Sequence, residues 1–233
     1  MDNAIVELKN LRKNYKQGKL AVEALCGIDL KLNQGDFIAV AGPSGSGKTT
    51  LMNIIGLIDT PSSGSIYIEG RDASSFNRYE QTLFRRETLG FIFQSFNLLP
   101  VLNVFENIEL PLLLGKKKIP KNERRERVET LLENVGLADR RFHLPSELSG
   151  GQQQRAAIAR SLVSRPKIVI ADEPTANLDS HNGEKVLSVM KQINSALKTT
   201  FIFSTHDSSI WELSNHIIFL RDGKIESERR SGA

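Results

Sequence analysis

The sequence predicts an α/β fold built around a mostly parallel sheet. Runs of apolar, largely β-branched residues at 37–42, 167–173 and 199–206 have the continuous hydrophobicity of strands that are buried on both faces. Segments 4–11 and 22–32 alternate more regularly, which suits an antiparallel sheet with one solvated face. Helical periodicity appears between the strands, so strand and helix alternate along the chain.

Further strand-like segments lie at 65–70, 89–94 and 216–223. A helix is expected over 120–136, where apolar residues recur at helical spacing between Pro120, which suits a helix start, and Gly136, which suits its end. A second helix is expected over 180–197, with Ser180 as its N-cap. We expect the tail after Ile225 to be loosely held.

The stretch 95–148 is mostly helical in pattern and lies between two strand-rich halves. We interpret it as a helical subdomain inserted into a single domain of residues 1–233. Its apolar segment, 95–114, contains Leu112 and Leu113, which we expect to pack inside the protein.

The composition excludes several classes of protein. No apolar run approaches the ~20 residues needed to cross a bilayer, and the N-terminus lacks the basic and apolar regions of a signal peptide. The single cysteine, Cys26, cannot form an internal disulfide, so we expect a cytoplasmic location. The net charge of +4 falls largely in 115–127 and 227–232, where a solvated helix face and a polar tail account for it. No nucleic-acid partner is expected.

A phosphate-binding loop is predicted at residues 42–50. The sequence GPSGSGKTT matches G-x-x-x-x-G-K-[ST] and lies between a predicted strand and a predicted helix. Backbone N–H groups from Gly45 to Thr50 would surround a β-phosphate, Lys48 would reach the β- and γ-phosphates, and the Thr49 hydroxyl would bind Mg²⁺. The predicted nucleotide contacts in this loop are Gly42, Ser44, Gly45, Ser46, Gly47, Lys48, Thr49 and Thr50.

Two carboxylates follow the buried strand in IVIADE. Asp172 at the strand end is placed to hold Mg²⁺, and Glu173 is placed to orient the water that attacks the γ-phosphate and to accept its proton.

A second anion-binding pattern occurs in LPSELSGGQQQRAAIARSLV at 144–163. Ser149 and two glycines precede a helix-like pattern, and a helix start offers unpaired N–H groups to an anion. A single nucleotide does not need two such phosphate-binding sites.

The sequence LSGGQ at Leu148–Gln152 resembles the signature motif of the ATP-binding cassette (ABC) ATPases. Other elements of that family follow in the family's order: Tyr15 in LRKNYKQG, Gln94 in FIFQ, ANLD at Ala176–Asp179 and His206 in STHD. The resemblance covers essentially the whole chain. It implies a P-loop NTPase (RecA-like) core with an N-terminal antiparallel β-subdomain and an inserted helical subdomain.

The resemblance also implies a role for each matched residue. Tyr15 would stack on adenine, Gln94 would take part in catalysis and in Mg²⁺ binding, Asp179 would contact nucleotide, and His206 would act in catalysis beside Glu173 and Lys48. In this family the signature of one cassette faces the ATP on the P-loop of a second. The contacts Ser149, Gly150, Gly151 and Gln152 would therefore serve the ATP of a partner copy. ATP binding would close a homodimer and hydrolysis would release it.

Within the family, NIELPLLLGKKK, ADEPTANLDS and LSGGQQQR resemble the group that includes LolD, MacB and FtsE. Ala176 stands where this group usually has glycine. The resemblance implies a cassette at the inner face of the cytoplasmic membrane that drives a separate membrane subunit, in lipoprotein release or efflux. In this family the helical insertion receives the coupling helix of that subunit.

Several alternatives stay open. An FtsE-like regulator of the cell envelope fits the same motifs, and polar amino-acid importers share residues like FQSFNLLP. A soluble ABC ATPase acting on DNA or ribosomes would need a long coiled-coil insertion or a second cassette, and the sequence has neither. A P-loop phosphotransferase would not explain LSGGQ. A catalytically dead cassette is opposed by the intact Lys48, Asp172, Glu173 and His206.

Overall fold

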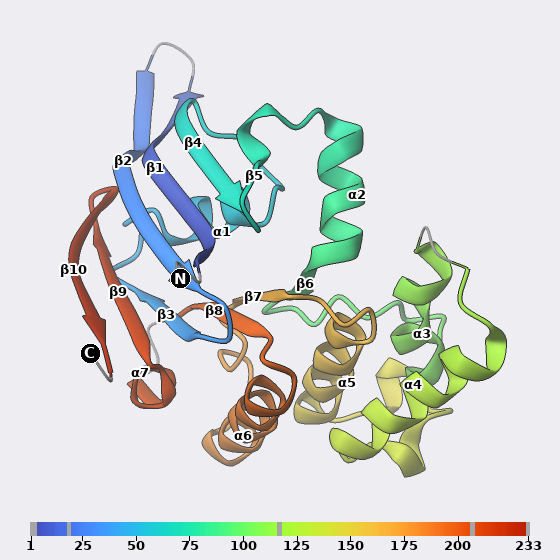
Figure 1. Cartoon of the computed structure of the whole chain (residues 1–233). Helices are drawn as coiled ribbons and strands as arrows, with labels where there is room; N and C mark the ends of the chain where they lie inside the picture. Colours follow the sequence, from blue (N-terminus) through green and yellow to red (C-terminus); the bar gives the residue numbers. More distant parts are fainter. Residues whose placement is uncertain (1–3, 18–19, 116–117, 206–207, 232–233) are drawn as a thin grey trace.

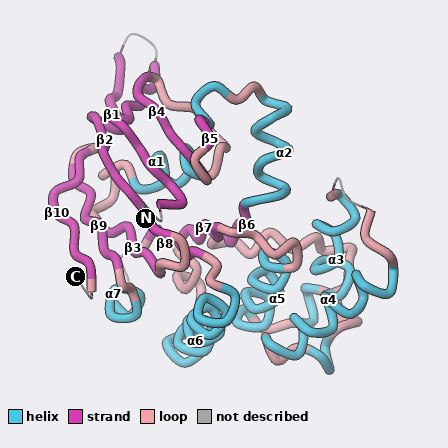
Figure 2. Tube along the Cα trace, viewed as in Figure 1, coloured by secondary structure: helices cyan, strands magenta, loops and turns pink. Residues whose placement is uncertain are grey.

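The computed structural model of the chain describes residues 4–17, 20–115, 118–205 and 208–231, which form two sheets and their flanking helices (Figures 1 and 2). The first sheet is antiparallel and contains, in spatial order, β2 (Leu20–Asn33), β1 (Ala4–Gln17), β4 (Ser63–Ile68) and β5 (Arg71–Asp72). Strands β1 and β2 are longer than the sequence predicts, so Tyr15 lies in a strand and pairs with Val22.

The second sheet contains, in spatial order, β10 (Lys224–Arg230), β9 (His216–Arg221), β3 (Phe37–Ala41), β8 (Thr200–Ser204), β7 (Ile168–Asp172) and β6 (Leu89–Ile92). All neighbours in it are parallel except β9 and β10. Every residue of β3 and β8 is buried, which confirms the interpretation of their continuous apolar runs. The prediction of a loosely held tail is wrong, because Lys224–Arg230 hydrogen-bonds to β9 as an exposed edge strand.

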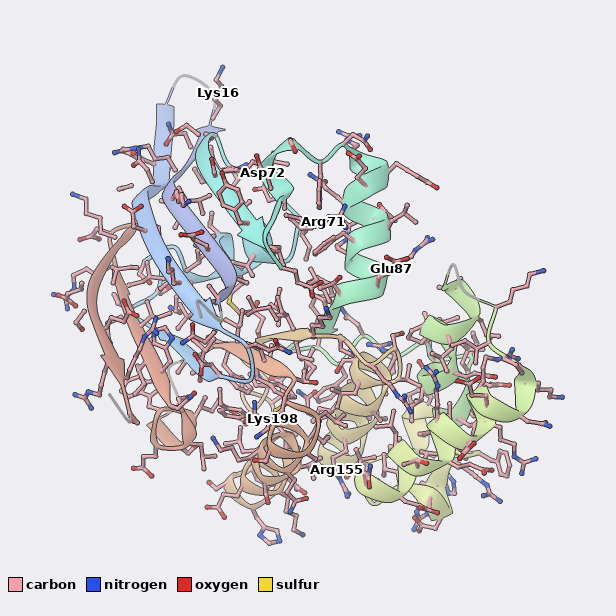
Figure 3. The ribbon with its side chains drawn as sticks, in the orientation of Figure 1. Lys16, Arg71, Asp72, Glu87, Arg155 and Lys198 are labelled. Atoms are coloured by element: carbon pink, nitrogen blue, oxygen red, sulfur yellow. The ribbon has the colours of Figure 1, made fainter. Side chains whose placement is uncertain are left out.

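The helices are α1 (Lys48–Ile55), α2 (Arg78–Thr88), α3 (Val104–Leu114), α4 (Lys121–Asn134), α5 (Gly150–Leu162), α6 (Ser180–Leu197) and α7 (Ser208–Leu213). Short 3₁₀ turns lie at Ala73–Ser75, Ala138–Arg140 and Pro145–Glu147. Helices α4 and α6 confirm the two predicted from periodicity. The N-cap of α6 is Asp179 rather than the predicted Ser180, and α6 ends where Lys198 takes a left-handed conformation (Figure 3). None of the helices in the described ranges is long and apolar enough to cross a membrane.

Three apolar clusters hold these layers together. Alternate residues of β3 point to opposite faces, with Ile38 and Val40 in the cluster under the antiparallel sheet and α1, and Phe37 in the cluster against α5, α6 and α7. The third cluster joins α3 and α4 to α5. Helix α5 therefore belongs to both the core sheet and the helical insertion, and Figure 1 shows it between them.

The insertion carries the expected helices, α3 and α4, within residues 95–148. Leu112 is buried in its core, as expected. The expectation for Leu113 is wrong, because this side chain is 53% exposed. Successive residues of a helix point in directions about 100° apart, so Leu113 faces solvent while Leu112 turns inward.

Candidate functional site

The predicted phosphate-binding loop connects the end of β3 to the first turn of α1. Gly42 and Gly47 have φ of +144° and +103°, and neither position has room for a side chain. A Cβ at Gly42 would lie 2.1 Å from the carbonyl oxygen of Leu220, and one at Gly47 would lie 2.6 Å from that of Ala24. Glycine is needed at both positions, because the loop passes closely between β2 and β9.

Lys48 folds back over this loop. Its Nζ donates to the carbonyl oxygens of Gly42 at 2.7 Å and Pro43 at 2.9 Å. The first N–H groups of α1 have no acceptor inside the helix, and the positive end of the helix dipole lies with them. The ammonium group and these N–H groups therefore gather at one loop, which is the arrangement that binds a phosphate.

A cavity of about 560 Å³ opens over the loop. Its walls are residues 42–45 and 47–50, residues 22–24 of β2, and Glu173 and Ser204 at the carboxyl ends of β7 and β8. All of the predicted loop contacts except Ser46 line this cavity. Ser46 is buried, and within the described residues its Oγ has no hydrogen-bond partner.

The two predicted carboxylates lie side by side in the chain but border different hollows. Glu173 lines the P-loop cavity, whereas Asp172 borders a hollow of about 30 Å³ beside Asn53 of α1. Glu173 has φ of +44°, a left-handed conformation that costs a non-glycine residue about 1–2 kcal/mol, and its N–H donates to the carbonyl oxygen of Ser204 at 2.9 Å. Strained residues of this kind cluster at functional sites, where the surrounding structure holds them.

Tyr15 does not line the P-loop cavity but lies beside one of its walls. Its cross-strand partner Val22 is one of the cavity walls, and residues directly opposite in an antiparallel pair share a face of the sheet. The hydroxyl donates to Oδ2 of Asp59 at 2.7 Å. Burial and the bond to Asp59 raise the pKa of the Tyr15 hydroxyl.

The predicted signature residues form the capped N-terminus of helix α5. Ser149 is the N-cap of α5, its N–H donates to Oε1 of Gln152 at 2.9 Å, and its Oγ accepts from the N–H of Gln152 at 3.4 Å. A Cβ at Gly151 would lie 2.8 Å from the Asn182 side chain, so close packing against α6 needs glycine there. Gly150 is only partly buried.

No residue from 148 to 152 borders the P-loop cavity in the described part of the chain. Figure 1 shows α5 beside α3 and α4, well separated from α1. The two anion-binding patterns therefore do not meet within one copy of the protein.

Gln94 follows β6 and has an exposed side chain, and its carbonyl oxygen accepts from Nδ2 of Asn177 at 2.9 Å. Asp179, predicted to contact nucleotide, is engaged as the cap of α6: Oδ1 accepts from the N–H of Asn182 at 3.0 Å and Oδ2 from its Nδ2 at 2.7 Å. These bonds lower the pKa of Asp179. His206 lies outside the described residues.

Sequence reasoning missed three residues that support this site: Lys13, Asp59 and Arg160. Lys13 and Asp59 support Tyr15, and Arg160 of α5 donates to the carbonyl oxygens of two residues that follow Gln94. Their partners are distant in the chain, so no local pattern marks them.

Comparisons with known proteins agree with this geometry. The sequence model of the ABC transporter family matches residues 25–176. The lipoprotein-releasing system ATP-binding protein LolD of Pseudomonas syringae is 42% identical over 96% of this chain and 98% of its own. The macrolide export ATP-binding/permease protein MacB of Bdellovibrio bacteriovorus is 45% identical over 97% of this chain, which spans 34% of MacB.

A solved structure is also similar. It is a dimer of the ATP-binding cassette MJ0796 of Methanocaldococcus jannaschii in a post-hydrolysis state, bound to ADP and Pi. It matches with a TM-score of 0.88 and 42% identity, over 97% of this chain and 98% of that one.

Proposed function

The chain belongs to the ABC transporter family, and from this premise we propose that it is the ATP-hydrolysing subunit of a LolD- or MacB-like transport complex. The observation that carries the proposal is the separation of two anion-binding sites in one chain. The P-loop lines a cavity that the signature helix start does not reach. A second copy, placed head to tail, brings the signature of each chain to the P-loop of the other.

ATP binding rests on the P-loop cavity. The loop N–H groups and Lys48 would hold the β- and γ-phosphates, and Tyr15 beside the cavity wall would stack on adenine. Glu173 is the carboxylate on the cavity wall, so it would orient the attacking water and accept its proton. Gln94 and His206 would complete the catalytic set.

Mg²⁺ fits the oxygen donors that the motifs supply: the Thr49 hydroxyl, the Gln94 amide and the Asp172 carboxylate. No cluster of three or more His, Cys, Asp or Glu side chains that could hold a metal occurs among the described residues. Mg²⁺ characteristically takes few protein ligands and completes its shell with phosphates and water, so this sparse set is the kind it uses. Bound there, it would neutralise charge on the phosphates.

In the dimer, Ser149, Gly150, Gly151 and Gln152 would contact the γ-phosphate on the partner's P-loop, and Asp179 would lie near that interface. Hydrogen bonds to charged groups contribute about 1.5–3 kcal/mol each, so a few per nucleotide exceed the ~5.5 kcal/mol that moves a two-state equilibrium from 1:99 to 99:1. ATP binding can therefore close the dimer, and hydrolysis, which removes the γ-phosphate contacts, can release it.

The membrane subunit would dock on the helical insertion, from the cytoplasmic face of the membrane. Apolar side chains on this part of the surface are exposed, with Val101 at 82% and Leu114 at 58%. These exposed apolar side chains are candidate contacts for the membrane subunit.

The test is purification of the Glu173→Gln form with ATP from detergent-solubilised membranes, followed by mass spectrometry of the proteins that accompany it. Wild-type protein without ATP is the control. We expect a membrane subunit with a large extracytoplasmic domain. Recovery of ribosomes, DNA or only soluble proteins would leave the ATPase assignment standing and would overturn the transport assignment.

A further inference from the structure

Tyr15 is held by a network that no sequence motif contains. Asp59, in the loop after α1, accepts from the Tyr15 hydroxyl through Oδ2 at 2.7 Å and from Nζ of Lys13 through Oδ1 at 2.6 Å. Nζ of Lys13 donates again to the carbonyl oxygen of Thr60 at 2.7 Å and lies 4.9 Å from the centroid of the Tyr15 ring. We call Lys13 and Asp59 the tyrosine anchor.

The anchor differs from an ordinary surface ion pair. Lys13 is only 9% exposed, so its ammonium group is largely removed from water and needs its partners. Burial raises the pKa of Asp59, but the hydrogen bonds from Lys13 and Tyr15 outweigh it and the net pKa is lowered. Asp59 therefore stays ionised as a double acceptor and holds both side chains.

The anchor joins the two parts of the nucleotide site. Tyr15 belongs to the antiparallel sheet, whereas the N–H of Asp59 donates to the carbonyl oxygen of Asn53 in α1 at 3.1 Å. The ring is thus fixed relative to the helix that carries the P-loop.

We propose that Asp59 and Lys13 are positioning residues that hold the Tyr15 ring beside the wall of the P-loop cavity and thereby strengthen binding of the nucleobase. The inference rests on the proposed function, in which Tyr15 is the base platform. A ring already fixed before binding loses little side-chain freedom when a base stacks on it. The anchor should therefore strengthen binding of the base and leave binding of the phosphates unchanged.

The test compares Tyr15→Phe with the wild type. This variant keeps the aromatic ring and the Lys13–Asp59 pair, so it removes only the bond to the anchor and does not threaten the fold. Tyr67→Phe is the matched control: Tyr67 lies in β4 of the same sheet with Nζ of Lys9 4.8 Å from its ring centroid, and its hydroxyl has no carboxylate partner in the described ranges. Affinity is measured by calorimetry for ATP and for inorganic tripolyphosphate, which has no base.

Stacking of a base on an aromatic side chain contributes about 5- to 150-fold in affinity. A ring without its anchor keeps part of this stacking affinity. We therefore expect Tyr15→Phe to weaken ATP binding about fivefold. Tripolyphosphate affinity should not change, and Tyr67→Phe should bind both ligands like the wild type. Asp59→Asn should weaken ATP binding too, because it removes the charge that holds Lys13 and weakens the bond to the Tyr15 hydroxyl. The part of that loss that acts through the Tyr15 hydroxyl should be absent in the Tyr15→Phe background.

Two results would overturn the inference while leaving the proposed function standing. One is wild-type ATP affinity in Tyr15→Phe. The other is equal weakening of ATP and tripolyphosphate, which would place the effect on the P-loop. A wild-type protein that binds no ATP would overturn the proposed function and this inference with it.

Discussion

Replacement of Arg160 by lysine tests how the loop after Gln94 is held. Nη1 of Arg160 donates to the carbonyl oxygen of Asn97 at 2.5 Å and Nη2 to that of Phe96 at 2.9 Å. Both loop residues have left-handed backbones, with φ of +57° at Phe96 and +50° at Asn97. Arg160 is partly buried, and this burial lowers the pKa of its guanidinium group.

The magnitude follows from these contacts. Hydrogen bonds to a charged group contribute about 1.5–3 kcal/mol each. Lysine can replace one of the two Arg160 bonds, but it cannot make both at once as the forked guanidinium group does. Two left-handed non-glycine residues cost about 1–2 kcal/mol each, a strain that the lost bond no longer offsets. We therefore expect Arg160→Lys to lower the free energy of unfolding by about 2 kcal/mol and the melting temperature by roughly 4–8 °C. Because displacement of a catalytic group by ~1 Å can cost 10²-fold, kcat should fall at least about tenfold while the KM for ATP changes little.

The assay is ATP hydrolysis by the purified protein, measured alongside thermal unfolding. Arg155→Lys is the control, because Arg155 lies on the same helix and clamps two adjacent carbonyl oxygens, those of Val135 at 2.8 Å and Gly136 at 3.4 Å (Figure 3). It should lose stability but keep its kcat. Equal kcat values in the two variants would refute the reasoning and leave Arg160 with a structural role alone.

Three further predictions concern the dimer and pH. Glu173→Gln should keep ATP binding but trap a closed dimer, because the attacking water loses its base; a monomer with ATP by light scattering would contradict this. Ser149→Arg should abolish hydrolysis while ATP affinity stays nearly unchanged, because the signature acts on the partner's nucleotide; an equal loss of binding in the monomer would refute action in trans. His216 is buried, and burial followed by the charge of Arg230 lowers its pKa below 6.5 despite the contact with Glu228 at 2.7 Å. The unfolded chain then takes up the proton first, so stability should decline as pH falls below about 6.5, and His216→Gln should flatten that part of a chemical-unfolding profile.

The sequence was informative where the chemistry is local. The P-loop, the acidic pair after β7 and the N-cap at Ser149 are contiguous patterns, and the structure places the P-loop and the helix cap as their spacing predicts. The fully buried strands were equally visible, because a short, continuous apolar run rich in β-branched residues is typical of a strand covered on both faces.

What the sequence did not show depends on distant pairing. The anchor bond between Tyr15 and Asp59 joins residues 44 apart, and Asp59 sits in no recognisable motif. Strand β10 escaped prediction for a different reason. It is an exposed edge strand with almost no apolar residues, so backbone pairing with β9 forms it without a hydrophobic pattern.

Helix α5 gives the proposed dimer a physical route between its two sites. Its N-terminus would bind the partner's phosphate. Further along the helix, Arg160 holds the loop after Gln94. Nε2 of Gln154 donates to the carbonyl oxygen of Pro174, the residue after Glu173, at 2.7 Å. Both bonds reach segments that, in the proposed function, would serve the nucleotide on the helix's own chain. A shift of α5 toward the partner's γ-phosphate must therefore strain or move those segments, since the interior packs too tightly to absorb it. In the proposed dimer, occupancy of one site would then be coupled to the catalytic geometry of the other through contacts already present in a single chain.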